Sequence, residues 1–315
     1  MTAAPVGRLA PSPTGVLHLG NARSFLLAWL DLRSRGGTVL LRIEDLDGPR
    51  VRGGAAEQVL EDLRWLGLDW DGEPLLQSSR AGAHAVALQR LAARGLAYPC
   101  TCTRADIERA ASAPHAGEEG PVYPGTCLGR WTDAAEAEAA TGRTPAWRFR
   151  VPDQEEVVRD RVAGERRYRV AEELGDFVIH KRDGQAAYQL AVVVDDAAAG
   201  VDSVLRGDDL LPSAARQQLL YRALEAVAPE WAHVPLVVGE DGRRLAKRHG
   251  DTSLQAFRDG GVSAEALVGW LAVTAGLREK AEPCAAAELV SDFSLDRLPR
   301  AATVWRGYPC PADGC

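Results

Sequence analysis

The chain has 315 residues, of which 46% are hydrophobic and 26% charged, and its formal net charge is -7 at pH 7. This hydrophobic content can build a sizeable core and excludes a disordered or collagen-like chain, and the length suggests about two domains. No apolar run reaches the roughly 18 residues that a membrane-spanning helix needs, and the N-terminus lacks the pattern of a secretory signal. We therefore expect a soluble, cytoplasmic protein with no membrane partner.

The acidic balance gives no overall attraction to nucleic acid, so any such contact needs a local patch of arginines. Lysine is rare: Lys181, Lys247 and Lys280 are the three in the chain. A lysine is therefore more informative here than an arginine.

The first expected elements form a strand–helix–strand unit. Residues 6–10 can extend, and residues 11–15 must turn because of their prolines and glycine. Apolar residues then recur at helical spacing over 19–30, the glycines at 36–37 end the helix, and residues 38–43 predict a buried strand. A unit of this size predicts a right-handed crossover and a parallel sheet.

The middle of the chain is less regular. Helices are expected at about 54–66 and 80–94. Over residues 96–174, short extended pieces such as 146–151 alternate with polar turns, and 134–140 favour a short helix. Because this stretch carries aromatic residues and clustered cysteines, we interpret it as an inserted domain.

Regular elements return after the insertion. They are two buried strands at 176–180 and 188–194, a helix at 213–227 capped by Ser213, a short strand at 236–238, a loop at 239–250, and mainly helices after residue 254, with 264–275 the clearest.

The turn at 11–21 places His18 and a small residue, Gly20, at a helix N-terminus directly after the first strand. Such an end presents unpaired N–H groups and a partial positive charge, which suit a polyphosphate, and a glycine lets a ligand approach the backbone closely. The alternative is an ordinary helix start in which His18 caps or packs. The segment has neither P-loop nor dinucleotide-fingerprint spacing.

Four ordered segments carry a resemblance to a known family. Residues 11–21 resemble the HIGH-type signature of class I aminoacyl-tRNA synthetases, and residues 244–248 lie where the KMSKS loop of that family would be. Residues 42–47 and 187–196 are similar to the glutamyl branch. The similarity runs almost continuously from Gly7 to about Phe257 and implies an α/β fold, with a Rossmann-like parallel-sheet catalytic domain.

The resemblance also implies a glutamate pocket, in which Arg8 and Arg206 pair with carboxylates, Glu44 with the ammonium group, and Tyr188 and Ser12 supply hydroxyls. The alternatives are a surface cation for Arg206 and a solvent-exposed carboxylate for Glu44. The family pattern maps the glutamate contacts onto Arg8, Ala10, Ser12, Glu44, Tyr188 and Arg206.

For ATP, which would bind with Mg²⁺, the resemblance implies catalytic roles for His18 and Lys247, which would stabilise charge on the phosphates. The loop departs from the family pattern, because Arg244 replaces the first lysine and Ala246 replaces the serine. The first signature likewise ends in Asn21 rather than histidine. The implied ATP contacts are Pro11, His18, Gly20, Asn21 and Lys247.

Three cysteines, Cys100, Cys102 and Cys127, lie close together and suggest a tetrahedral zinc site that needs a fourth ligand. Imidazole is the commoner zinc ligand, which favours His115, whereas the resemblance favours Tyr123. The zinc would be structural, and the alternative is three reduced cysteines without metal. We expect Cys310 and Cys315 to belong to an exposed terminus with no such role.

Only 65 residues follow Gly250. Among related families the chain therefore resembles the glutamyl-queuosine tRNA(Asp) synthetases, which are truncated relatives of bacterial glutamyl-tRNA synthetase. This implies ATP-dependent activation of L-glutamate as glutamyl-adenylate and its transfer to the queuosine nucleoside in the anticodon loop of tRNA(Asp). The alternatives are a minimal glutamyl-tRNA synthetase that charges a tRNA 3′ end and a non-catalytic tRNA-binding paralogue.

We expect a monomer with four segments. They are a first catalytic half at 1–95, an inserted zinc-binding acceptor-type domain at 96–174, a second catalytic half with the KMSKS-like loop at 175–257, and a short helical region with a tail at 258–315, without an anticodon-binding domain.

Overall fold

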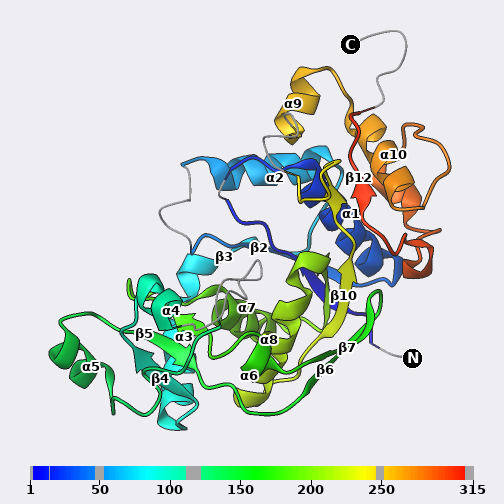
Figure 1. Ribbon diagram of the computed structural model, residues 1–315. Coiled ribbons are helices and arrows are strands. Elements are labelled where there is room, and N and C mark those ends of the chain that lie inside the picture. Colours follow the sequence, from blue (N-terminus) through cyan, green and yellow to red (C-terminus); the bar gives the residue numbers. More distant parts are fainter. Residues whose placement is uncertain (1–2, 14, 47–52, 111–121, 246–251, 309–315) are drawn as a thin grey trace.

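The computed structural model describes residues 3–13, 15–46, 53–110, 122–245 and 252–308 (Figure 1).

The chain begins with the predicted strand–helix–strand unit. Helix α1 (Leu19–Ser34) connects two parallel strands, β1 (Val6–Leu9) and β2 (Thr38–Ile43), and β3 (Leu75–Leu76) pairs in parallel with β2. Gly36 has a positive φ of 64°, a backbone conformation that residues other than glycine rarely adopt. It ends the helix where the sequence predicts. The parallel sheet is confirmed.

A second sheet has the strand order β7-β6-β10-β9. Strand β10 (Glu230–Val234) runs parallel to both β9 (Ser203–Gly207) and β6 (Glu156–Asp160), and β6 forms an antiparallel hairpin with β7 (Gly164–Tyr168). This hairpin lies within residues 96–174, so part of the stretch interpreted as an insertion shares a sheet with β9 and β10.

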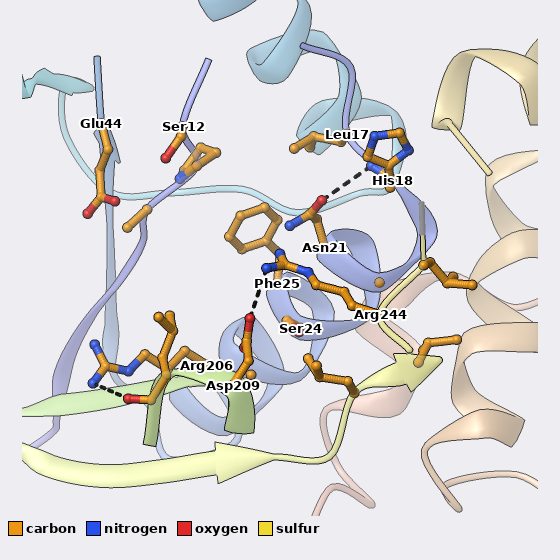
Figure 2. Close-up of a pocket in the computed structure, with 18 of the residues that line it drawn as sticks. Ser12, Leu17, His18, Asn21, Ser24, Phe25, Glu44, Arg206, Asp209 and Arg244 are labelled. Carbon is orange, nitrogen blue, oxygen red and sulfur yellow. Dashed lines mark hydrogen bonds and ion pairs between the residues drawn. The ribbon is translucent and has the colours of Figure 1, made fainter. Parts of the chain in front are cut away.

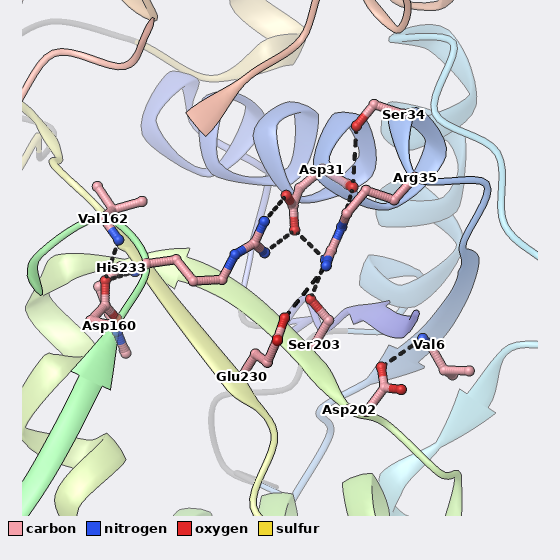
Figure 3. A network of polar contacts seen from close by, with 11 residues as sticks. Val6, Asp31, Ser34, Arg35, Asp160, Val162, Asp202, Ser203, Glu230 and His233 are labelled. Carbon is pink, nitrogen blue, oxygen red and sulfur yellow. Dashed lines mark hydrogen bonds and ion pairs between the residues drawn. The ribbon is translucent and has the colours of Figure 1, made fainter. Parts of the chain in front are cut away.

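Strand β1 lies beside β9. The Asp202 N–H donates to the Val6 carbonyl at 2.9 Å, and the Val6 N–H donates to Asp202 Oδ1 at 2.8 Å. A Cβ on Gly7 would lie 2.8 Å from the Ser203 carbonyl oxygen, so this approach requires glycine. Arg35, at the end of α1, also donates to Ser203 Oγ at 2.6 Å and ties the helix to β9 (Figure 3). The two sheets are therefore held side by side.

The third sheet is antiparallel and has the order β4-β5-β8. It consists of β4 (Ala97–Cys100), β5 (Ala146–Phe149) and β8 (Val178–His180), and α4 (Arg104–Ala110) and α5 (Ala134–Thr141) belong to the same region of the chain (Figure 1). The predictions of β5, α5 and β8 are confirmed.

Two large buried clusters form most of the core of the described residues, and a third, small one contains Tyr98, Cys100, Tyr123 and Cys127. One of the large clusters surrounds α1 and β2 together with α10 (Ala264–Thr274), and the other surrounds α3 (Ala81–Ala93) and α8 (Leu211–Ala223). Further helices in the described ranges are α2 (Ala55–Trp65), α6 (Val170–Glu173) and α9 (Leu254–Asp259). Within the described ranges, no helix is long and apolar enough to cross a bilayer.

The predicted strand at 188–194 is wrong, because these residues begin helix α7 (Tyr188–Ala198). Its side chains are buried on nearly every side, including Gln189, Asp195 and Asp196. A short apolar run has no period that separates a fully buried helix from a buried strand, and the three consecutive valines favoured the strand.

Ser213 does not cap a helix, because α8 begins two residues earlier with Pro212 in its first turn. Ser213 is buried inside the helix, where its Oγ accepts a hydrogen bond from Gln189 Nε2 at 2.9 Å. The helix also ends before residue 227, since Leu224 is its C-cap and Glu225 has a positive φ of 58°.

The C-terminal region is less helical than predicted. Strand β12 (Thr303–Val304) pairs in parallel with β11 (Val237–Val238), and short 3-10 turns at 286–289 and 295–297 separate α10 from β12. The pairing brings the end of the described chain to the strand that precedes the loop at 239–250.

Candidate active site

A cavity of about 550 Å³ opens where β1, β2 and β9 end and α1 begins (Figure 2). This cavity is lined by every described residue that we expect to contact glutamate or ATP. They are Arg8, Ala10, Pro11, Ser12, His18, Gly20, Asn21, Glu44, Tyr188 and Arg206. The structure thus brings together residues from five separate parts of the chain, while their individual contacts stay predictions. Lys247 and Ala246 lie outside the described residues.

The N-terminus of α1 forms one wall of the cavity. His18 is its N-cap, with extended backbone angles, and the His18 N–H donates to Asn21 Oδ1 at 3.5 Å. Leu19 N–H donates to the Thr252 carbonyl at 2.9 Å, which fixes the first turn against the segment after residue 251. A Cβ on Gly20 would meet no described atom within 4 Å, so the helix end is open to a ligand.

Arg8 and Glu44 are held by a buried ion network. Arg8 Nε donates to Asp196 Oδ1 and Oδ2 at 3.3 and 3.2 Å, and Arg42 Nη1 donates to Asp196 Oδ1. Arg42 Nη2 in turn donates to Glu44 Oε1 at 3.0 Å. Burial alone would raise the pKa of Asp196, but Arg42 and Arg8 hold it below its ordinary value. Asp196 therefore stays ionised and orients two cationic side chains.

Arg206 has a different environment. Its Nε donates to His233 Nε2 at 3.0 Å, its Nη2 donates to the Leu210 carbonyl at 3.3 Å, and its Cζ lies 5.0 Å from the centre of the Trp231 ring. The Nη1 atom is buried with no hydrogen-bond partner among the described residues. Burial also lowers the pKa of Arg206 below its ordinary value. A buried, incompletely paired guanidinium at a cavity wall suits a ligand carboxylate.

The base of the KMSKS-like loop reaches the same cavity. Arg244 and Leu245 line it, and Arg244 Nη1 donates to Asp209 Oδ2 at 2.9 Å (Figure 2). Val238 and Arg244 form an isolated antiparallel bridge, which places the start and the end of the described loop together. The cation that replaces the first lysine of the motif thus lies at the cavity with a carboxylate partner.

The cysteine cluster lies apart from this cavity, at the end of β4. The Sγ atoms of Cys100, Cys102 and Cys127 all lie within 4.8 Å of one another. Tyr123 Oη lies 3.4 Å from Cys100 Sγ and 3.7 Å from Cys102 Sγ, and it accepts a hydrogen bond from the Cys127 N–H at 2.8 Å. Arg148 donates from Nε to Cys100 Sγ at 3.3 Å. His115 lies outside the described residues.

The thiols of the cysteine cluster differ in acidity, and burial raises the pKa of Cys102 to about 12. Burial alone would raise the pKa of Cys127, but hydrogen bonds from Tyr123 and from the Thr101 backbone lower this pKa. Three thiols and a phenol oxygen that converge in this way can supply the four ligands of a tetrahedral ion.

Sequence reasoning missed Asp209, which lines the cavity, and four residues behind its wall: Arg42, Asp160, Asp196 and His233. The adjacent carboxylates at 195–196 after an apolar run were a usable signal, since unpaired acids are rarely buried. His233 and Asp160 gave no such signal, because β10 and β6 were not predicted.

Comparisons with known proteins place the fold in a family. Residues 6–305 match the family described as "tRNA synthetases class I (E and Q), catalytic domain". The chain belongs to this family.

The relatives include two proteins named "Glutamyl-Q tRNA(Asp) synthetase". The one from Symbiobacterium thermophilum is 50% identical over 303 residues, which cover 93% of this chain and 94% of the relative. The one from Rhodopirellula baltica is 49% identical, with 95% of this chain and 92% of the relative covered. A solved structure of a glutamate tRNA ligase from Elizabethkingia meningosepticum, in complex with its amino acid, has a TM-score of 0.81 at 27% identity, covering 96% of this chain and 67% of that one.

The walls of the cavity come from segments on both sides of the cysteine region in the chain, since β1 and α1 precede this region while α7, β9 and the start of the loop follow it.

Proposed function

We propose that the chain activates L-glutamate with ATP as glutamyl-adenylate and transfers it to the queuosine nucleoside in the anticodon loop of tRNA(Asp). The observation that carries the proposal is the cavity, whose wall combines two buried arginines, a carboxylate and an open helix N-terminus. The identity with proteins named for this activity supports the same assignment. As a class I synthetase, the chain is a ligase-type enzyme.

In the first step, a glutamate α-carboxylate oxygen attacks the α-phosphorus of ATP. A new P–O bond forms and the bond to the β-phosphate bridge breaks, which releases pyrophosphate. Arg8 and Arg206 are assigned to the carboxylates of glutamate and Glu44 to its ammonium group, while the N-terminus of α1 and Gly20 receive the phosphates. His18 and Lys247 are assigned to stabilise the charge that develops on the phosphates.

In the second step, a hydroxyl of the queuosine cyclopentene-diol attacks the activated carbonyl. The new ester bond forms as the bond between the carbonyl carbon and the bridging oxygen breaks, AMP leaves with that electron pair, and the hydroxyl proton is released with it. Most of the acceleration comes from positioning and electrostatics rather than from a covalent enzyme intermediate. Mg²⁺ enters with ATP as part of the substrate.

We assign one structural zinc ion to Cys100, Cys102, Tyr123 and Cys127. The convergence of three Sγ atoms and the Tyr123 oxygen supports this donor set, and thiolates are the ligands that zinc favours. The ion would join the end of β4 to residues 123–127 and would take no part in the reaction. We also propose that the chain is a monomer divided at about residues 95, 174 and 257.

Pyrophosphate exchange tests the first step. Purified chain should catalyse exchange that depends on both glutamate and ATP without any tRNA. Exchange that appears only after tRNA(Glu) is added would contradict the proposal and favour a minimal glutamyl-tRNA synthetase.

Labelled glutamate tests the second step. The label should attach to tRNA(Asp) that contains queuosine, not to the queuosine-lacking form, and should remain after the 3′ terminus is trimmed. Tight tRNA binding without exchange or transfer would instead support a non-catalytic paralogue.

A further inference from the structure

The two buried arginines in the cavity wall are held by chemically different groups. Arg8 Nε contacts the ionised carboxylate of Asp196, whereas Arg206 Nε contacts the imidazole of His233. Both arginines are 6% exposed. No carboxylate in the described ranges forms an ion pair with Arg206. Arg206 is therefore held by neutral groups, with no carboxylate of the described residues directly paired to it.

The hydrogen bonds around His233 define its tautomer. A guanidinium N–H can only donate, so the His233 Nε2 that it contacts must be an acceptor. His233 Nδ1 lies 2.6 Å from Asp160 Oδ2, so Nδ1 carries the proton and donates to the carboxylate. Burial lowers the pKa of His233 to about 4, although the hydrogen bond with Asp160 acts to raise it. The imidazole is therefore neutral at pH 7.

Packing fixes the imidazole as well. His233 is 1% exposed and stacks on Trp231, whose ring centre is 6.2 Å away. The same Trp231 ring lies 5.0 Å from the Arg206 Cζ atom. The side chains of Asp160, His233 and Arg206 thus form a chain of hydrogen bonds that runs from β6 through β10 to the cavity. Figure 3 shows the Asp160–His233 end of this chain.

We propose that Asp160 and His233 are positioning residues that hold Arg206 toward the substrate without neutralising it, so that the cavity selects a substrate carboxylate over a neutral carboxamide. A carboxylate in place of His233 would orient Arg206 equally well but would cancel its charge. The imidazole orients the guanidinium and leaves its charge for the ligand. The inference deepens the proposed function and rests on it for its substrate, glutamate, and for the competing amide, glutamine.

Asp160→Asn gives a sharp test because the local hydrogen bonds dictate how the amide must sit. Asp160 Oδ1 accepts from three backbone N–H groups, those of Val162 at 2.9 Å, Ala163 at 2.7 Å and His233 at 3.1 Å. The asparagine oxygen must keep this position, so its NH₂ group faces His233 Nδ1. The imidazole proton then moves to Nε2, where it opposes the N–H of Arg206.

The inference predicts a specific kinetic pattern in glutamate-dependent pyrophosphate exchange. Asp160→Asn and His233→Leu should each raise the KM for glutamate about 10- to 100-fold, as expected for the loss of a hydrogen bond to a charged group, with the KM for ATP changed less than about twofold. The preference for glutamate over glutamine should fall about tenfold or more. His233→Gln should recover most of the activity, since its amide oxygen can accept from Arg206.

His84→Leu is the matched control. His84 is also 1% exposed, and its Nε2 lies 3.0 Å from Asp195 Oδ1, but it does not line the cavity. This variant should lower thermal stability as much as His233→Leu does while the glutamate KM and the glutamine preference stay unchanged. Adding Asp160→Asn to His233→Leu should have no further effect on the glutamate KM, because the first residue acts through the second.

Nitrogen-15 NMR of the labelled full chain tests the tautomer independently of any activity. At pH 7 the wild-type His233 ring should carry its proton on Nδ1 and the Asp160→Asn ring on Nε2. A wild-type ring protonated on Nε2, or on both nitrogens, overturns the inference. So does an active wild type whose Asp160 and His233 variants keep its glutamate KM and glutamine preference. A wild type with the Nδ1 tautomer but no glutamate-dependent exchange instead overturns the proposed function.

Discussion

The guanidinium of Arg8, in the first strand, donates from Nε to both carboxylate oxygens of Asp196, which lies 188 residues away in α7. The Asp196 side chain is 1% exposed and also contacts Arg42, so one carboxylate balances two buried cations. This contact joins the two halves of the chain behind the cavity.

Asp196→Asn should therefore be strongly destabilising. Because it leaves Arg8 buried without its compensating charge and leaves Arg42 with Glu44 as its remaining ion-pair partner, we expect the free energy of unfolding to fall by about 3–5 kcal/mol. Urea denaturation followed by circular dichroism measures this change.

Asp69→Asn serves as the control for that measurement. Asp69 pairs with Arg33 at 2.8 Å, but its side chain is 71% exposed, so the loss should be about 1 kcal/mol or less. Equal losses in the two variants would contradict the role given to Asp196.

Stability should also depend on pH through His233. Burial lowers its pKa from the ordinary 6.5 to about 4, so the unfolded chain takes up this proton at a higher pH than the folded chain does. The stabilisation is then complete above pH 6.5 and is lost as the pH falls toward 4, by roughly 3 kcal/mol in all. Unfolding free energies measured across this window should decline more steeply for the wild type than for His233→Gln, and parallel curves would refute the prediction.

The start of the fold could be predicted because local signals agree there. Apolar residues at helical spacing, a left-handed Gly36 and a buried strand of β-branched and leucine residues all favour one arrangement. The run at 188–194 lacked such agreement, because a helix buried on almost every side has no polar face to reveal its period. Its burial is set by β8, α3 and α8, which the local sequence cannot report.

The residues around the cavity likewise fall into two groups, those that could be predicted from the sequence and those that could not. Residues that face it, such as Arg8, Glu44 and Arg206, occupy motif positions and were found through the family resemblance. Asp196 and His233 act through those residues and come from elements whose type or existence was not predicted. Their partners are set by sheet order and packing, so only the folded chain brings them together.

Metal content tests the cysteine cluster. The purified chain should contain about one zinc ion, and Cys127→Ser should lose most of it and unfold at a lower temperature, because a structural ion contributes directly to folding. Mass spectrometry of the metal content measures the first effect and differential scanning calorimetry the second.

Cys284→Ser separates loss of the ion from loss of a buried thiol. Cys284 is buried among apolar residues of the core around α1 and is not part of the cysteine cluster. Its variant should keep the zinc of the wild type. Equal zinc in all three proteins, or none in the wild type, would refute the assignment.

Gly20→Ala should separate stability from ATP binding. Gly20 is the second residue of α1, and an added Cβ would meet no described atom within 4 Å, so alanine should stabilise the helix by up to about 1 kcal/mol. The same methyl group would project into the space assigned to ATP. We therefore expect a higher melting temperature together with a KM for ATP raised about tenfold or more in pyrophosphate exchange.

Gly82→Ala is the counterpart that completes this test. Gly82 is the second residue of α3, is exposed, and likewise has no described atom within 4 Å of an added Cβ, but it lies outside the cavity. Its alanine variant should gain similar stability with no change in the KM for ATP. If Gly20→Ala also left that KM unchanged, the phosphates could not approach the N-terminus of α1 as closely as the proposed mechanism requires.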